Sequence, residues 1–173
     1  MKGQPLDTNA QFLQAYDDFA DAIFRHCYYR VSDRERARDI MQETFTRTWE
    51  YIATQNGHIE NIRAFLYRIA NNLIIDEYRK KKTSSLDELR DKGFDPGHDE
   101  ETDIHTTIAA REVIALFDKL DISYREVLIM RYIDDIAPKE IANILGESEN
   151  AISVRLHRGI KKIKELTERS RKI

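Results

Sequence analysis

Hydrophobic positions recur every three or four residues along most of the chain, which is the period of an amphipathic α-helix. The first apolar stripe runs from Phe12 through Ile23 to Cys27, and it predicts a helix that ends near Val31. Cys27 lies within this stripe, so we expect a buried thiol there.

Capping residues mark where two further helices begin in the first half of the chain. Ser32 and Glu35 have the spacing of a capping box, so a second helix is expected from there to about Ile52. Asn61 can cap a third helix, whose apolar stripe faces the same core. Residues 1–82 are therefore expected to form a small three-helix domain.

Apolar stripes return near the start of the second half. One helix is expected from about Ala109 to Leu120. Ser123 and Glu126 again have capping-box spacing and predict a helix that ends near Tyr132.

The following helices have the pattern of a helix-turn-helix. Pro138 suits the first turn of a helix, Gly146 the left-handed position just past its end, and Ser148 the cap of the final helix. Ala142 is small where two crossing helices approach closely, and Ile152 can pack into the angle between them. A short helical hairpin in any bundle would give a similar pattern and is the alternative.

The segment between the two halves differs in charge from both. Residues 83–104 hold 2 Lys/Arg and 8 Asp/Glu, whereas residues 1–82 hold 13 and 12, and residues 105–173 hold 13 and 11. Turn formers and repeated acids are typical of a tether. The predicted fold is all-α, with two small helical domains joined by a flexible acidic linker, and the second domain contains the helix-turn-helix.

Composition narrows the range of functions. The chain has 173 residues, few Gly and Pro, and a single cysteine, which excludes an internal disulfide and leaves no thiolate pair for zinc. No nucleophile arrangement, glycine-rich phosphate loop or metal-ligand spacing appears, so we expect neither an enzyme nor a cofactor. The acids and histidines of the segment from His98 to His105 could be assembled into a metal site, but their place on a mobile linker argues against one.

The chain also lacks targeting signals. Its first residues show no basic-then-apolar signal pattern, and no apolar run approaches the roughly 18 residues of a membrane span. A cytoplasmic protein without membrane insertion is expected.

Although the net charge is −3, cations gather at two helix ends. Residues 149–173 hold 8 Lys/Arg and 3 Asp/Glu, and Arg79–Lys82 are four consecutive cations. Screening limits the reach of distant charge to about 8–10 Å, so such patches can bind nucleic acid from an acidic protein. On the final helix, polar and basic side chains lie away from the apolar stripe, where a recognition helix meets base edges. A solvated basic face is the alternative.

Taken together, both halves resemble the small bacterial sigma factors of the extracytoplasmic-function group, within the sigma-70 family. RDIMQETFTRTWEYI resembles the family's core-polymerase-binding helix, and IRAFLYRIANNLIIDEYRKK resembles its promoter-melting and minus-ten-reading helix. LDKLDISYREVLIMRYIDDIAPKEIANILGESENAISVRLHRG is similar to its minus-thirty-five-reading domain. Ala137 departs from the family pattern, because a hydroxyl cap is usual before the proline.

The resemblance implies three groups of site residues. The polymerase-binding residues would be Asp39, Gln42, Glu43 and Thr46. The minus-ten DNA-binding residues would be Asn56, His58, Asn61, Arg63, Phe65, Tyr67, Arg68, Asn71, Asn72, Arg79 and Lys80. The minus-thirty-five DNA-binding residues would be Ser148, Asn150, Ser153, Arg155, Arg158, Lys161 and Lys162.

The implied partners are core RNA polymerase, promoter DNA and an anti-sigma factor, and the chain is expected to be a monomer when free of them. Two other functions stay open at the level of the residues. One is a stand-alone helix-turn-helix regulator, which would bind duplex DNA as a symmetric dimer. The other is a protein-interaction module whose basic ends contact an acidic partner.

Overall fold

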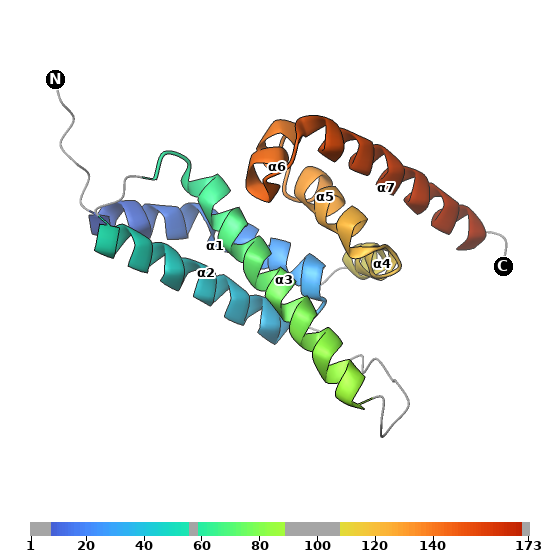
Figure 1. Ribbon diagram of the computed structural model, residues 1–173, viewed down its shortest axis with the longest axis horizontal. Helices are drawn as coiled ribbons and strands as arrows, with labels where there is room; N and C mark the ends of the chain where they lie inside the picture. Colours follow the sequence, from blue (N-terminus) through green and yellow to red (C-terminus); the bar gives the residue numbers. More distant parts are fainter. Residues whose placement is uncertain (1–7, 56–58, 89–107, 171–173) are drawn as a thin grey trace.

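The computed structural model describes residues 8–55, 59–88 and 108–170, and this part of the chain consists of α-helices without any β-strand (Figure 1). The helices are α1 Thr8–Val31, α2 Arg34–Gln55, α3 Ile62–Glu88, α4 Ile108–Asp118, α5 Ile122–Tyr132, α6 Pro138–Leu145 and α7 Glu149–Ser170. The predicted all-α class is confirmed. Helix α3 continues six residues past position 82, where the acidic linker was expected to begin, and the remainder of that linker lies outside the described residues.

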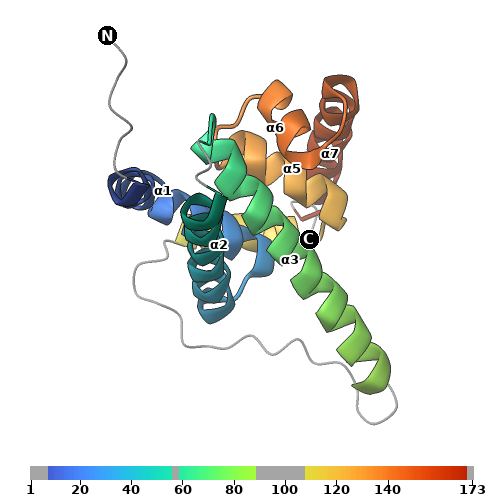
Figure 2. The same cartoon turned by 60° about the vertical axis from the view of Figure 1, so that its left-hand side comes forward.

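The first three helices pack around one core. Helices α1 and α2 form an antiparallel pair, and α3 lies across both of them (Figures 1 and 2). Ile23 of α1, Phe45 of α2, and Leu66 and Ile74 of α3 are buried where the three helices meet. Cys27 is fully buried, as predicted.

The second domain contains the predicted helix-turn-helix. Pro138 occupies the first turn of α6, and Gly146 ends that helix in the left-handed conformation, with φ of 69°. The Ser148 hydroxyl accepts a hydrogen bond from the backbone N–H of Ala151 at 3.1 Å and so caps α7. Ala142 and Ile152 are both buried in the angle between the two helices.

A second glycine allows close packing between α5 and α7. A Cβ atom on Gly159 would lie 2.9 Å from Cδ1 of Leu128, closer than side-chain carbons normally approach. The glycine therefore lets the backbone of α7 rest directly on the buried leucine of α5.

One of the predicted caps is confirmed and one is wrong in the first domain. The Asn61 side chain accepts the backbone N–H of Ala64 at 2.9 Å, as expected for the cap of α3. Helix α2 is capped by Asp33, which accepts the backbone N–H of Arg36 at 2.9 Å, and not by Ser32. Ser32 has a positive φ of 57° because it ends α1, and its hydroxyl donates to Asp118 of the second domain.

The predicted capping box of α5 is also wrong. Asp121 is the N-cap residue, and no side chain caps the helix start. The Glu126 carboxylate instead accepts hydrogen bonds from Arg30 at 3.3 Å and Arg155 at 3.4 Å. Those partners lie far away in the sequence, so the local spacing could not reveal them.

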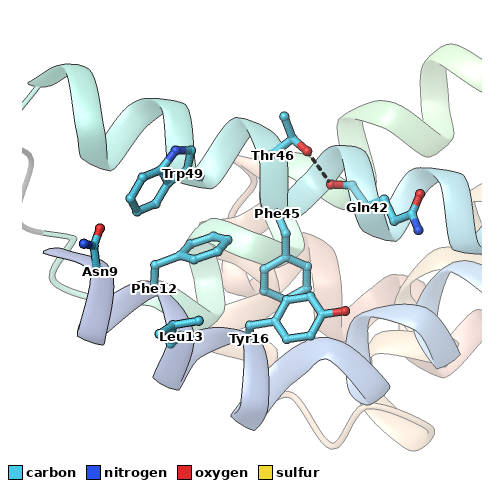
Figure 3. A pocket seen from close by; sticks show the side chains of 8 residues that line it. All are labelled: Asn9, Phe12, Leu13, Tyr16, Gln42, Phe45, Thr46 and Trp49. Atoms are coloured by element: carbon cyan, nitrogen blue, oxygen red, sulfur yellow. Dashed lines mark hydrogen bonds between the residues drawn. The ribbon is translucent and has the colours of Figure 1, made fainter.

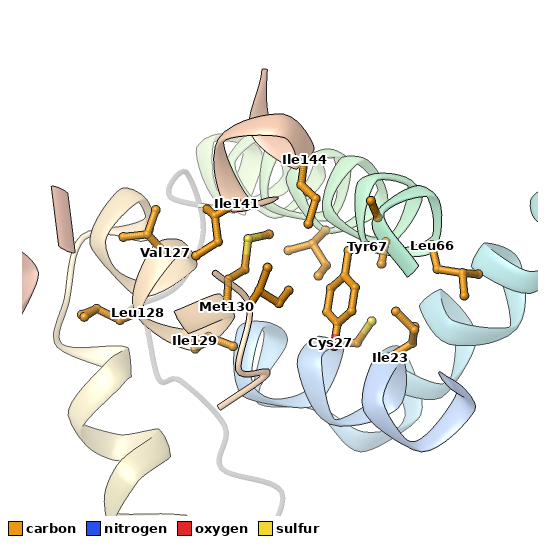
Figure 4. Packing of buried hydrophobic residues seen from close by; sticks show 14 of the residues in the cluster. Ile23, Cys27, Leu66, Tyr67, Val127, Leu128, Ile129, Met130, Ile141 and Ile144 are labelled. Atoms are coloured by element: carbon orange, nitrogen blue, oxygen red, sulfur yellow. The ribbon is translucent and has the colours of Figure 1, made fainter. Parts of the chain in front are cut away.

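The two domains are packed against each other. Helix α6 lies along α3, and α5 lies along α1 (Figures 1 and 2). In Figure 4, Tyr67 and Cys27 of the first domain face Met130, Ile129 and Ile144 of the second. Their side chains belong to one continuous apolar cluster, so the domains share a core across their boundary.

The start of α6 offers a direct test of helix capping. Ala137 has the extended backbone of an N-cap residue, with φ of −67° and ψ of 146°. Its side chain has no oxygen that could accept a hydrogen bond from the free backbone N–H groups of the first turn. In Ala137→Ser the hydroxyl can accept the N–H of Glu140, so the free energy of unfolding should rise by about 1 kcal/mol. Urea denaturation followed by circular dichroism measures the change. Ala115→Ser, in the exposed middle of α4, is the control and should lower stability slightly; an unchanged or lower midpoint for Ala137→Ser would contradict the assignment.

Candidate nucleic-acid and partner interfaces

The outer face of α2 carries the residues predicted to bind polymerase. Asp39, Gln42, Glu43 and Thr46 are all exposed along this face, whereas Phe45 on the opposite side is 3 % exposed. They are held by short-range contacts within the helix: Arg47 donates to Glu43 at 2.7 Å, and Thr46 donates to the carbonyl of Gln42 at 3.0 Å. These four exposed residues, the α2 face, therefore form a preformed polar surface.

An apolar groove of about 750 Å³ borders the α2 face (Figure 3). Aromatic rings of α1 and α2 line it, with Phe12 and Trp49 in edge contact at 5.2 Å between ring centroids. Gln42 and Thr46 belong both to the groove and to the α2 face. Phe45 is buried, whereas Trp49 is only half-buried and contributes its ring to the groove wall.

An ion pair fixes α2 against α3. The guanidinium of Arg36 donates to both carboxylate oxygens of Glu77, with the Nε contact at 3.1 Å. The hydrogen bond and the charge of Glu77 raise the pKa of Arg36 above its usual value. This fork-to-carboxylate geometry sets the rotation of α2, and hence the direction in which its polar face points.

Residues predicted to meet minus-ten DNA are divided by the structure into exposed and covered groups. Exposed side chains along α3 and its start are Asn61, Arg68, Asn72, Arg79 and Lys80. Phe65 is half-buried against the ring of Tyr51, with centroids 4.9 Å apart. Asn56 and His58 lie outside the described residues.

Tyr67 and Asn71 differ from the expectation of a solvent-facing surface. Tyr67 is 1 % exposed and Asn71 is 4 % exposed. Burial, together with the nearby charge of Asp134, raises the pKa of Tyr67. Neither side chain can reach a base in this arrangement, because the second domain lies over that side of α3.

Two arginines of α3 are held by the second domain. Arg63 donates to the backbone carbonyls of Asp134 at 2.9 Å and Asp135 at 3.3 Å. Arg68 donates to the carbonyl of Asn143 at 2.9 Å. Arg63 also lies 3.8 Å from the Glu140 carboxylate of α6, so it meets both carbonyls and a charge, whereas the printed partner of Arg68 is a neutral carbonyl.

The minus-thirty-five candidates on α7 are mostly exposed. Exposed members of the set are Ser148, Asn150, Ser153, Arg158, Lys161 and Lys162. Arg155 differs, because its side chain is 20 % exposed and forms ion pairs with Glu126 and Glu147. Of the two arginines in this set, Arg158 is therefore the exposed one.

Other kinds of site receive no support in the described ranges. Residues 8–55, 59–88 and 108–170 contain no group of three or more His, Cys, Asp or Glu side chains arranged to hold a metal. The acids and histidines between His98 and His105 lie outside these ranges. Within the same ranges, each helix is too short or too polar to cross a bilayer.

Comparison with known proteins agrees with this division into two regions. The family model for sigma-70 region 2 matches residues 15–84, and that for sigma-70 region 4 matches residues 110–163. Curated relatives that match nearly the whole chain are sigma factors, and several of them belong to the extracytoplasmic-function (ECF) group. The chain belongs to the ECF group of the sigma-70 family.

Individual relatives are distant but extend over both regions. RNA polymerase sigma factor SigV of Bacillus subtilis is 29 % identical over 159 residues, covering 89 % of each chain. ECF RNA polymerase sigma factor BldN of Streptomyces coelicolor is 26 % identical over 158 residues, which are 90 % of this chain and 60 % of BldN. Among solved structures, sigma factor RpoE of Bartonella quintana, in complex with the anti-sigma factor NepR, has a TM-score of 0.71 at 19 % identity, covering 91 % and 97 % of the two chains.

The sigma factor described here therefore directs core RNA polymerase to promoters in transcription initiation. Sigma factors are initiation factors and not a class of enzymes. The helix-turn-helix belongs to region 4, so the stand-alone regulator suggested by the sequence is wrong. Region 2 occupies the part of the chain that such a regulator would use for dimerisation or sensing.

The reactivity of the Cys27 thiol depends on how well the core of the sigma factor is packed. Cys27 is fully buried, and loss of solvation raises the pKa of its thiol from 9.0 to about 12. Because the folded state favours the neutral thiol, the contribution of Cys27 to the free energy of unfolding is complete below pH 9. It is lost as the pH rises toward 12. The thiolate is the reactive form, so burial and the raised pKa both protect Cys27.

Alkylation of the native sigma factor at pH 8 should be at least about 100-fold slower than alkylation in 6 M guanidinium chloride, because little thiolate is present or accessible. Iodoacetamide labelling followed by mass spectrometry measures both rates. A free cysteine peptide in the same two solutions corrects for the effect of the denaturant. Equal corrected rates would show that Cys27 is not buried in solution.

Proposed function

We propose that the sigma factor binds core polymerase through the α2 face, holds minus-ten DNA on α3 and the loop before it, and reads minus-thirty-five DNA with α7. The observation that carries the proposal is the separation of three chemically distinct surfaces on three helices. An exposed face of acidic, amide and hydroxyl side chains lies on α2, an exposed set of amides and cations lies along α3, and an exposed polar and basic surface lies on α7.

The α2 face suits a protein partner better than DNA. Asp39 and Glu43 are acidic and would repel phosphate, whereas they would attract a basic protein surface. The groove beside them adds apolar area next to charge, and such a mixture is typical of protein interfaces. We assign the clamp helices of the polymerase's largest subunit as the partner.

Helix α3 suits single-stranded DNA. Aromatic stacking and cationic attraction to phosphate hold unpaired bases with little geometric demand. Phe65 can supply a stacking face at one end, and the exposed Arg79 and Lys80 can supply phosphate contacts at the other. Polar side chains such as Asn61 and Asn72 would meet the edges of bases lifted from the stack.

Helix α7 suits duplex DNA. Its first turns present Asn150, Ser153 and Arg158, and a recognition helix contacts base edges with these turns. Lys161 and Lys162 follow one turn later and suit phosphates of the backbone.

The same surfaces would be the targets of an inhibitor. The RpoE structure contains the anti-sigma factor NepR, and CnrH, a further fold relative with a TM-score of 0.70, is in complex with the cytosolic domain of CnrY. We extend this to an anti-sigma partner that competes with polymerase, and to a cytoplasmic location beside the polymerase.

The polymerase-binding assignment is tested by reversing one charge on the α2 face. Asp39→Lys should weaken binding to core polymerase by about tenfold or more. The polymerase surface that pairs with the Asp39 carboxylate would then face a cation. Fluorescence anisotropy measures the affinity, and run-off transcription with core polymerase and a promoter library measures the activity. Asp21→Lys makes the same charge change on the exposed side of α1 and should leave both unchanged.

Equal loss of polymerase affinity in Asp39→Lys and Asp21→Lys would show that the α2 face has no special role in polymerase binding. A wild-type protein that yields no transcript with core polymerase, yet binds duplex DNA tightly alone, would overturn the promoter assignment of all three surfaces.

The minus-thirty-five assignment is tested by separating base reading from phosphate attraction. Arg158→Ala should cost about 1–3 kcal/mol at one base pair of the minus-thirty-five element and relax the preference there. Lys161→Ala is the control, because loss of a phosphate contact should weaken all promoters alike and reduce the salt slope by about one. Holoenzyme binding to promoters substituted at each minus-thirty-five position measures both effects. Uniform weakening by Arg158→Ala would show that it, too, contacts only phosphate.

A further inference from the structure

Val154 is an exposed apolar residue among the polar and basic side chains of α7. It is 41 % exposed. Of the large hydrophobic residues that are exposed in the described ranges, it is the only one on α7. Single exposed hydrophobic residues are common on protein surfaces, so it is the position of Val154, and not exposure alone, that points to a role.

The valine lies opposite the buried stripe of α7. The buried residues nearest to it in sequence are Ile152 and Leu156, which are 0 % and 7 % exposed and stand two positions before and two positions after Val154. Two positions on an α-helix correspond to a rotation of about 200°. The valine therefore points away from the rest of region 4, from the middle of the exposed face.

The side chains around Val154 are those proposed to meet DNA. Asn150 lies four positions before it and Arg158 four positions after it, and residues four apart share a helix face. Ser153 precedes it directly, and Lys161 lies about two turns further on. All four neighbours are exposed. A helix that presents these groups to the major groove therefore presents the methyl groups of Val154 to it as well.

The fold gives no reason for a valine at this position. Val154 lies outside the apolar core cluster and outside the partly buried residues packed against it. Because valine is β-branched, it loses side-chain freedom in a helix and stabilises helices less than alanine, lysine or glutamate does. The same stiffness favours a contact with DNA, because a side chain with one preferred rotamer has little entropy to lose on binding.

The major groove offers one apolar group that matches such a side chain. Base edges there carry hydrogen-bond donors and acceptors, and thymine adds its C5-methyl group. Valine cannot pair with a donor or an acceptor, and covering one of these without a partner costs free energy.

We propose that Val154 is a specificity-determining residue of the sigma factor, which contacts the methyl group of a thymine in the minus-thirty-five element. The polar residues of α7 then read hydrogen-bonding groups on base edges, and Val154 reads the methyl group between them. This inference rests on the proposed role of α7 in reading that element.

The experiment removes the thymine methyl and nothing else. Deoxyuridine pairs with adenine as thymidine does and keeps the O4 acceptor, but it has no C5-methyl group. Each thymine of the minus-thirty-five element, on either strand, is replaced singly in a promoter that the holoenzyme selects from a library. Fluorescence anisotropy of the labelled promoter measures holoenzyme affinity. Loss of one methyl contact should weaken binding by about fourfold at the contacted thymine.

Three variants show whether Val154 makes this contact. Val154→Ser should bind thymine and uracil promoters equally at that position, because its side chain has no methyl group to bury. Val154→Ile keeps a branched apolar side chain and should keep the preference for thymine. Lys161→Ala should weaken binding to both promoters alike and also keep the preference, because a phosphate contact carries no base information.

Each failure gives a distinct result. Unchanged affinity at every thymine would overturn the proposal, and so would a full preference for thymine in Val154→Ser or its loss in Lys161→Ala. If α7 does not read the minus-thirty-five element, wild-type binding will be insensitive to every base-pair substitution there. Sensitivity to base pairs without sensitivity to the methyl group would keep the role of α7 and remove that of Val154.

Discussion

Burial of Tyr67 between the two domains is the constraint on which the arrangement of this sigma factor depends. Its ring belongs to α3, yet it lies in one apolar cluster with Met130, Ile129 and Ile144 of region 4 (Figure 4). Burying an aromatic side chain of this size is worth about 2–3 kcal/mol. The same side chain therefore contributes both to the fold of region 2 and to its association with region 4.

Helix α3 consequently has two kinds of surface. Its apolar stripe closes the core of region 2, and its remaining surface contains the groups suited to DNA. The second domain meets that surface with carbonyl oxygens that accept from Arg63 and Arg68, and with the Glu140 carboxylate 3.8 Å from Arg63.

Local sequence rules succeeded where one residue satisfies its own neighbourhood. Asn61, Pro138, Gly146 and Ser148 stand where predicted, because capping and turn geometry involve residues only a few positions apart. The rules were wrong at the two capping boxes. Glu126 binds Arg30 and Arg155 and does not cap the start of its own helix. A tertiary ion pair therefore overrides the local capping-box spacing.

The sequence by itself determined the helices, the turn of the helix-turn-helix, the two-region order and the family, because periodicity and motif order are properties of the linear chain. Only the tertiary structure decided which candidate residues are exposed. Tyr67 and Asn71 are buried and Arg155 is paired, while Arg158 is exposed. The physical reason is that burial depends on contacts such as that of His26 with Asp134, which are 108 positions apart and leave no local pattern.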